Sequence, residues 1–115
     1  MPDSIIVAMS ACPDEQSAQR ISAALVSERL ATCINRVGGV RSTYVWEGRL
    51  QDDAEILLIM KTTSARLALL DARLRELHPY EMPELVAFRV DGGNVAYLDW
   101  VRRGVATEGG AGERR

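Results

Sequence analysis

Three side chains in this sequence offer the kinds of atoms that bind transition metals: the thiol of Cys33, the imidazole of His78 and the carboxylate of Glu81. Such a mixed set suits copper or zinc better than magnesium or calcium. His78 is the only histidine, and Glu81 follows it by three residues. One chain supplies too few ligands for a closed site. We therefore expect copper or another divalent ion to bind weakly, near the boundaries between subunits.

Two of these residues also have a purely structural interpretation. Cys33 lies near the start of a predicted strand, where a buried thiol packs as a small hydrophobic group. His78 stands beside Pro79 at a predicted helix end, where it can satisfy the last carbonyl groups and favour the negative end of the helix dipole. Both alternatives stay open. Cys12 is the only other cysteine, and we expect two thiols rather than a disulfide.

A second group of residues can form a ligand pocket. Its members are Trp46, Lys61, Tyr80, Glu81 and Glu84. Between subunits they can line a pocket for a small anionic or amphiphilic ligand. The competing interpretation is that the aromatic rings pack across strands or on a neighbouring subunit. A lysine at a strand end more often reaches solvent or pairs with a carboxylate than acts as a nucleophile, so we predict no catalytic residue.

Several function classes are excluded by the rest of the sequence. The strand predicted at 55–60 is aliphatic and lacks the aromatic residues on which RNA-recognition modules stack bases. The loop at 10–15 is acidic, which would repel a bound phosphate. There is no CxxC motif for a metal chaperone.

The charge and apolar runs of the chain also limit its partners. With 14 basic and 16 acidic residues and a net charge of −2, there is no basic block for nucleic acid or an anionic membrane. No apolar segment approaches the roughly 18 residues that a bilayer span needs. No basic leader precedes the first apolar run, so we expect a cytoplasmic protein.

Hydrophobic periodicity predicts the first elements that must position these residues. The apolar run at 5–9 predicts a buried strand. Residues 13–30 predict a helix that begins with Pro13 and two acidic residues and carries one apolar stripe. From 31 to 61 the period changes to two, which predicts a long hairpin with its turn at 47–49.

The remaining elements follow the hairpin. Gly38 and Gly39 predict a bulge or bend within it. The hydroxyl residues 62–64 are expected to cap a second helix, whose leucines recur at steps of three and four until Pro79 stops it. A strand at 84–90 and a short helix capped by Asn94 complete the domain.

The predicted order is βαββαβ plus a C-terminal helix. This is the α+β, ferredoxin-like split βαβ arrangement, with two helices on one face of an antiparallel four-stranded sheet. We expect one domain over 1–106 and a disordered tail of Gly, Glu and Arg at 107–115. The long hairpin arms would expose unpaired edges in a single chain, so we predict a homotrimer.

Several motifs in this order resemble the CutA family of divalent-cation-tolerance proteins. They are Ala31-Thr32-Cys33-Ile34-Asn35, Ser42 to Gly48, Met60-Lys61-Thr62, His78 to Glu84, and Tyr97-Leu98-Asp99-Trp100. The resemblance runs from Ile5 to about Val101. It departs from the family pattern at Cys12-Pro13, where Ala-Pro is usual, and at Gly38-Gly39, where Pro-Gly is usual.

This resemblance implies a ferredoxin-like trimer linked by the family name to tolerance of divalent cations, and by several members to copper binding. It implies no established catalytic reaction and no organic cofactor. We therefore expect a non-enzymatic, trimeric tolerance protein that binds copper or another divalent ion. The alternative is a trimeric regulatory or scaffold module that binds a small ligand or a protein partner at subunit interfaces.

Overall fold

Helices and strands alternate along residues 3–106, the part of the chain that the computed structural model describes. The elements are β1 (Ile5–Cys12), α1 (Glu15–Ser27), β2 (Cys33–Trp46), β3 (Arg49–Thr63), α2 (Leu67–Leu77), β4 (Val86–Arg89) and α3 (Val95–Gly104). The strands form one antiparallel sheet in the order β2-β3-β1-β4. The predicted α+β, split βαβ fold is confirmed. The tail predicted at 107–115 lies outside the described residues.

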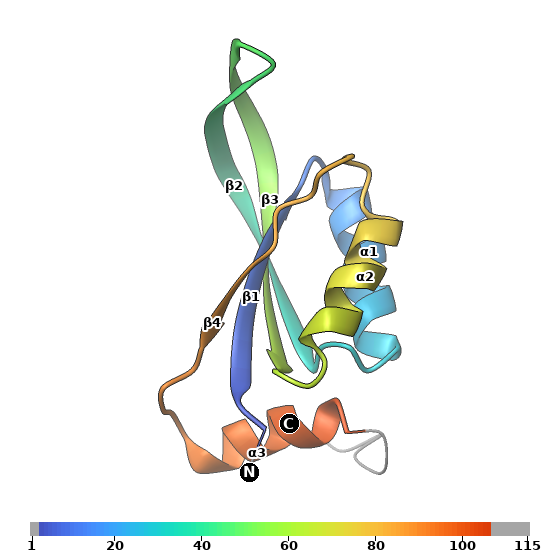
Figure 1. Cartoon of the computed structure of the whole chain (residues 1–115), viewed down its shortest axis with the longest axis vertical. Coiled ribbons are helices and arrows are strands. Elements are labelled where there is room, and N and C mark those ends of the chain that lie inside the picture. Colours follow the sequence, from blue (N-terminus) through green and yellow to red (C-terminus); the bar gives the residue numbers. More distant parts are fainter. Residues whose placement is uncertain (1–2, 107–115) are drawn as a thin grey trace.

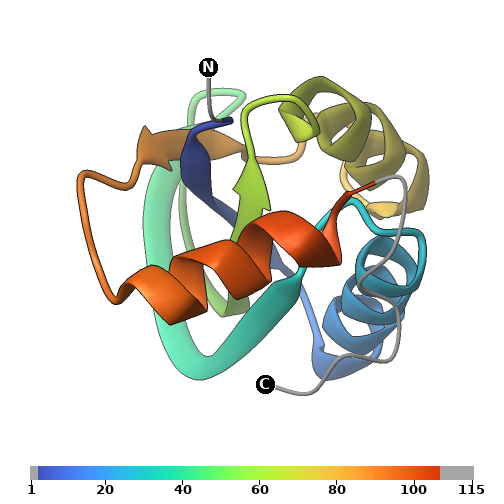
Figure 2. The ribbon, with the colours of Figure 1, turned by 90° about the horizontal axis from the view of Figure 1, so that it is seen from below.

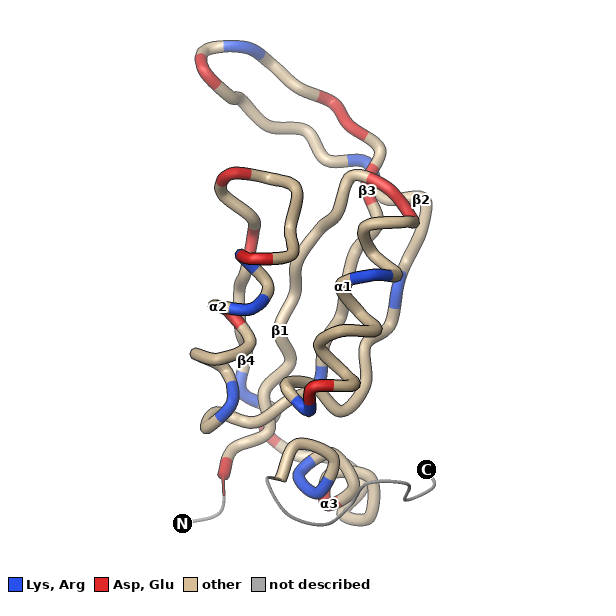
Figure 3. Tube along the Cα trace, turned by 90° about the vertical axis from the view of Figure 1, so that its right-hand side faces the viewer, with Lys and Arg blue, Asp and Glu red and all other residues tan. Residues whose placement is uncertain are grey.

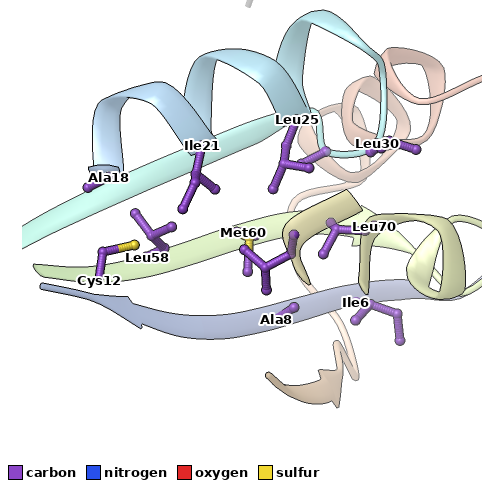
Figure 4. Close-up of a cluster of buried hydrophobic side chains, with 12 residues drawn as sticks. Ile6, Ala8, Cys12, Ala18, Ile21, Leu25, Leu30, Leu58, Met60 and Leu70 are labelled. Carbon is purple, nitrogen blue, oxygen red and sulfur yellow. The ribbon is translucent and has the colours of Figure 1, made fainter. Parts of the chain in front are cut away.

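One face of the sheet carries the hydrophobic core. Helices α1 and α2 lie side by side over this face (Figure 1). Side chains of β1 and β3 point up to meet them, and Figure 4 shows the resulting cluster. Its fully buried members include Ala8, Ile21, Leu25, Leu58, Met60, Leu70 and Leu74. The burial of apolar surface from both layers holds the helices on this face of the sheet.

Helix α1 ends earlier than the periodicity predicts. It begins at Glu15 rather than at the predicted Pro13, and the Asp14 side chain caps it by accepting a hydrogen bond from the Ser17 amide at 2.8 Å. The helix was expected to continue to Leu30, but it stops at Ser27. Arg29 adopts a φ of 61°, the left-handed conformation that terminates helices. Glycine usually takes this position, so the sequence carries no clear stop signal here.

Helix α2 is not capped by the hydroxyl residues that were expected to cap it. Thr62 and Thr63 belong to strand β3, and the helix starts at Leu67 with no side-chain cap. The Thr62 hydroxyl instead donates to the Leu30 carbonyl oxygen at 2.7 Å. That prediction was wrong because the β3 ladder extends to Thr63, which pairs with Ile5 of β1.

The β2–β3 hairpin projects beyond the body of the molecule (Figure 1). Its turn lies at Glu47 and Gly48, which have φ values of 50° and 76°. Two positive φ values suit the twist of a tight hairpin turn. A register shift between Val37 and Val40 confirms the predicted irregularity at the glycine pair.

Helix α3 crosses one end of the sheet, as seen from below in Figure 2. Its predicted cap is confirmed, because the Asn94 side chain accepts from the Tyr97 amide at 2.9 Å. Gly104 lies so close to Thr32 that an added Cβ would stand 2.4 Å from a threonine methyl group. Within residues 3–106, no helix is long and apolar enough to cross a membrane.

The second face of the sheet carries none of the helices in the described part of the chain (Figure 1). Val7 and Lys61 are cross-strand neighbours on it, as are Met9 and Ile59. These side chains are half-buried at most, unlike their neighbours on the helical face. We call this the open face. Strands β2 and β4 form the two edges of the sheet.

Candidate functional site

A cleft of about 710 Å³ lies between the hairpin and the loop that joins α2 to β4. It is lined by Ala11, Ser42, Thr43, Tyr44, Trp46, Glu55, Pro79, Tyr80, Glu81, Met82 and Glu84. We refer to it as the acidic cleft. From the hairpin, Ser42, Tyr44 and Trp46 share one face of β2, and Thr43 between them also reaches the cleft. The loop supplies the other wall.

His78 fixes the start of this loop. The residue is buried, with 7% of its surface exposed. Nε2 lies 2.7 Å from the Ala11 carbonyl oxygen, and Nδ1 accepts from the Tyr80 amide at 3.1 Å. A carbonyl oxygen only accepts and an amide only donates, so the proton sits on Nε2 and Nδ1 is bare. Both ring nitrogens are therefore used to hold the loop against β1.

His78 also provides a hydrogen-bond partner for a backbone carbonyl group at the end of the sheet. Strand β4 pairs with β1 only from Ile6 to Met9, so the backbone of Ala11 extends past the end of its partner. A buried carbonyl group without a partner costs free energy. The imidazole supplies the donor that the short strand cannot.

Two tyrosines hold two carboxylates at the cleft. The Tyr80 hydroxyl donates to Glu55 at 2.7 Å, and the Tyr44 hydroxyl donates to Asp53 at 2.6 Å. Burial, followed by the hydrogen bond to Glu55, raises the pKa of Tyr80 far above its usual value. The hydrogen bond to Asp53 likewise raises the pKa of Tyr44. Both tyrosines therefore stay neutral hydrogen-bond donors.

The predicted metal ligands are not brought together within one chain. Cys33 is opposite Lys61 on β3, which is opposite Val7 on β1. His78 contacts Ala11, four residues further along β1, so Cys33 and His78 lie about 15 Å apart by strand spacing. Glu81 lines the cleft. No group of three or more His, Cys, Asp or Glu side chains in residues 3–106 is placed to hold a metal ion.

Four of the five residues predicted to form a ligand pocket lie along the cleft. These are Trp46, Tyr80, Glu81 and Glu84. Lys61 does not join them, because it lies toward the other end of the open face and donates to the Asn35 side chain. The cleft therefore presents carboxylates without a lysine, which disfavours the anionic ligand that the sequence suggested.

Sequence analysis missed Glu55 as a site residue. It is 7% exposed, although glutamate is rarely buried without a partner. A signal was present in the sequence, since Glu55 is a charged residue directly before the aliphatic run 56–60. Its side chain shares a face with Leu57 and Ile59, while Leu58 and Met60 face the helices.

Comparison with known proteins places these features in one family. The family model described as CutA1 divalent ion tolerance protein matches residues 6–104. The divalent-cation tolerance protein CutA of Thermus thermophilus is 46% identical over 96 residues, which cover 84% of this chain and 93% of that protein. Human protein CutA is 40% identical over 103 residues. That match covers 90% of this chain but only 58% of the human protein's length.

Solved structures agree with the sequence comparison. The Thermus thermophilus divalent cation tolerance protein superposes with a TM-score of 0.86 at 43% identity, covering 89% of this chain and 99% of that one. The crystal structure of CutA from Xylella fastidiosa gives a TM-score of 0.88 at 39% identity, covering 90% and 99%. The matches include both walls of the acidic cleft, since the family model spans the hairpin and the loop. This chain belongs to the CutA1 divalent ion tolerance protein family.

Proposed function

We propose that this protein acts in divalent-cation tolerance as a homotrimeric binding protein with no catalytic reaction of its own. The observation that supports assembly is the apolar surface left on the hairpin and on β4. Val45 is 66% exposed, Leu50 74% and Phe88 56%. Val45 and Leu50 are cross-strand neighbours on the hairpin, and exposed apolar patches mark interfaces between proteins. The cytoplasm is the compartment that we propose, and cell fractionation tests it.

The sheet edges support the same proposal. β2 and β4 each present one unpaired edge, and a closed ring of identical copies can pair or cover both. The family resemblance supplies the number three. Sedimentation equilibrium at micromolar concentration is expected to give three times the mass of the chain. A monomer at that concentration would contradict the proposal.

For the cation itself, we propose a weak copper site shared between subunits. The thiol of Cys33 is half-buried and Glu81 is exposed in the cleft, so both are available to a neighbouring chain. His78 can join only if copper displaces one of its two ring hydrogen bonds. The site is therefore expected to depend more on Cys33 than on His78.

Calorimetric titration with Cu²⁺ tests this metal site. Cys33→Ser is expected to weaken binding most, Glu81→Gln less, and His78→Ala least. Binding should also weaken as the pH falls, because protons compete with the metal for the thiolate. Cys12→Ser is the control, since that thiol is buried in the core and burial raises its pKa to about 11. Equal binding by all four variants would rule out these ligands.

A second candidate function is that of a trimeric regulatory module with a small ligand in the acidic cleft. The observation that favours it is the cleft itself, which has the size of a small-molecule site and three aromatic side chains in its walls. Metal-free protein distinguishes the two candidates. A cleft ligand should bind without copper, whereas the tolerance proposal requires the metal.

A further inference from the structure

Charge is distributed unevenly around the acidic cleft. Its lining includes Glu55, Glu81 and Glu84 but no lysine or arginine. Figure 3 shows acidic segments on both the hairpin and the loop that follows α2. On the hairpin, Arg41 pairs with Asp52 at 3.2 Å, and Arg49 is the cross-strand neighbour of Trp46 but does not line the cleft. The whole chain carries a net charge of only −2, so this concentration of carboxylates is local.

Of the three glutamates in the lining, Glu55 is the one that is buried. It is 7% exposed and accepts one hydrogen bond, from the neutral hydroxyl of Tyr80. No lysine or arginine within residues 3–106 forms an ion pair with it. Buried charges in proteins are normally paired with an opposite charge. A cation in the cleft would complete this pairing.

The aromatic walls supply a second kind of attraction for a cation. The hydroxyl groups of Tyr44 and Tyr80 already donate hydrogen bonds to carboxylates. Their rings, rather than their hydroxyl groups, are therefore available to contact a ligand. Trp46 adds a third ring and is 43% exposed. The faces of such rings attract ammonium groups, tryptophan most strongly.

The geometry points to a small organic amine, with ammonium groups on a short apolar chain, as the ligand of the acidic cleft. This inference rests on the second candidate function above and names the class of its ligand. A bare metal ion fits less well, since no three ligands converge within residues 3–106 and a volume of about 710 Å³ suits a molecule. A quaternary ammonium fits less well because it cannot donate hydrogen bonds to the carboxylates.

More than one ammonium group is expected in the preferred ligand. Glu55 lies on the hairpin wall, whereas Glu81 and Glu84 lie on the loop wall. A diamine or longer polyamine places one charge near each wall and its methylene groups between the rings. Affinity should therefore rise from a monoamine to a diamine to a triamine.

Tryptophan fluorescence tests the inference directly. Trp46 lines the cleft and Trp100 lies on α3, so Trp100→Phe leaves a single reporter. Metal-free protein is titrated with butylamine, putrescine and spermidine at physiological ionic strength. Saturable binding is expected, and Glu55→Gln should weaken it about tenfold or more, as for a charged hydrogen bond lost. Asp91→Asn, an equal charge change at an exposed loop position, should leave it unchanged.

Several outcomes would overturn the inference. These are no saturable response to any of the three amines, equal effects of Glu55→Gln and Asp91→Asn, or choline binding as tightly as spermidine. If Glu55→Gln fails to fold, the exposed Glu84→Gln takes its place and should weaken spermidine more than butylamine.

The same samples separate this inference from the proposed function. Their sedimentation mass and copper titration are measured in parallel. Loss of amine binding by a trimer that still binds copper overturns the amine ligand alone. A monomer that binds amines overturns the trimer and keeps the ligand.

Discussion

The two faces of the sheet are built from the same strands but differ in how deeply their side chains are buried. On the helical face, Leu58 and Met60 are fully buried beneath α1 and α2. On the open face, Leu57 and Ile59 from the same strand are only half-buried. Because side chains alternate along a strand, β3 contributes one set of residues to the buried core and the other set to a partly exposed surface. The helical face makes the fold of one chain, and the open face, with the acidic cleft at its end, is where we propose that its interactions take place.

The adjacent leucines Leu57 and Leu58 provide the most direct way to break this comparison. Leu58→Ala leaves a cavity in the packed core and is expected to lower the free energy of unfolding by about 3 kcal/mol. Leu57→Ala should cost less in the chain itself and act on assembly instead. Thermal melting at several protein concentrations measures the loss of stability, and sedimentation measures assembly separately, because the melting temperature of any oligomer depends on concentration.

A clear result would reverse the comparison. If Leu57→Ala destabilises the protein as much as Leu58→Ala at every concentration, the open face is part of the single-chain core. The difference between the two faces would then be one of exposure and not of role.

His78 supports the second prediction, which concerns the end of the open face. His78→Ala removes the donor to the buried Ala11 carbonyl and the acceptor of the Tyr80 amide. We expect a loss of about 2 kcal/mol in unfolding free energy and faster hydrogen exchange in the loop. His78→Gln, which can restore a donor, is the matched variant and should recover part of the loss. Unchanged exchange in both variants would show that the imidazole does not hold the loop.

Most of the fold was predictable because its signals are local. The hairpin turn, the glycine bulge and the Asn94 cap all follow from residues that act within a few positions of themselves. The end of α1 was not predictable in this way. It depends on the left-handed conformation of Arg29, which the sequence does not predict because arginine rarely adopts it.

The site was predictable only in part, because register between distant strands decides it. Trp46 and Tyr80 could be placed in one pocket, since turn and proline signals fix where the hairpin and the loop begin. Lys61 could not be placed, because its neighbours are set by pairing with Val7 and Cys33 across the sheet. Glu55 was missed for the same reason, since only the assembled cleft shows that it is buried.

A third prediction concerns the hydrogen bond between Tyr80 and Glu55 within the cleft. Tyr80→Phe removes the only hydrogen-bond donor that residues 3–106 supply to the buried carboxylate and should cost about 1 kcal/mol at neutral pH. Tyr44→Phe is the matched comparison, since it removes a similar bond to Asp53 from a tyrosine that is 40% exposed. Its expected loss is smaller because solvent can replace the bond. Chemical denaturation of both variants measures the difference.

The smallest expected effect is the pH dependence of that same bond. Burial and the contact with Glu55 raise the pKa of Tyr80 in the folded protein above its unfolded value of about 10. The stability that Tyr80 contributes is therefore fully present below pH 10, and it declines as the pH rises further, because the unfolded chain then releases a proton that the folded chain retains. Denaturation at pH 8 and at about pH 11 should show the gap between wild type and Tyr80→Phe narrowing by a few tenths of a kcal/mol or more. A gap that stays constant over this range would mean that the phenol is not held by Glu55, and the buried carboxylate would then need another partner, which is the role that the amine is proposed to fill.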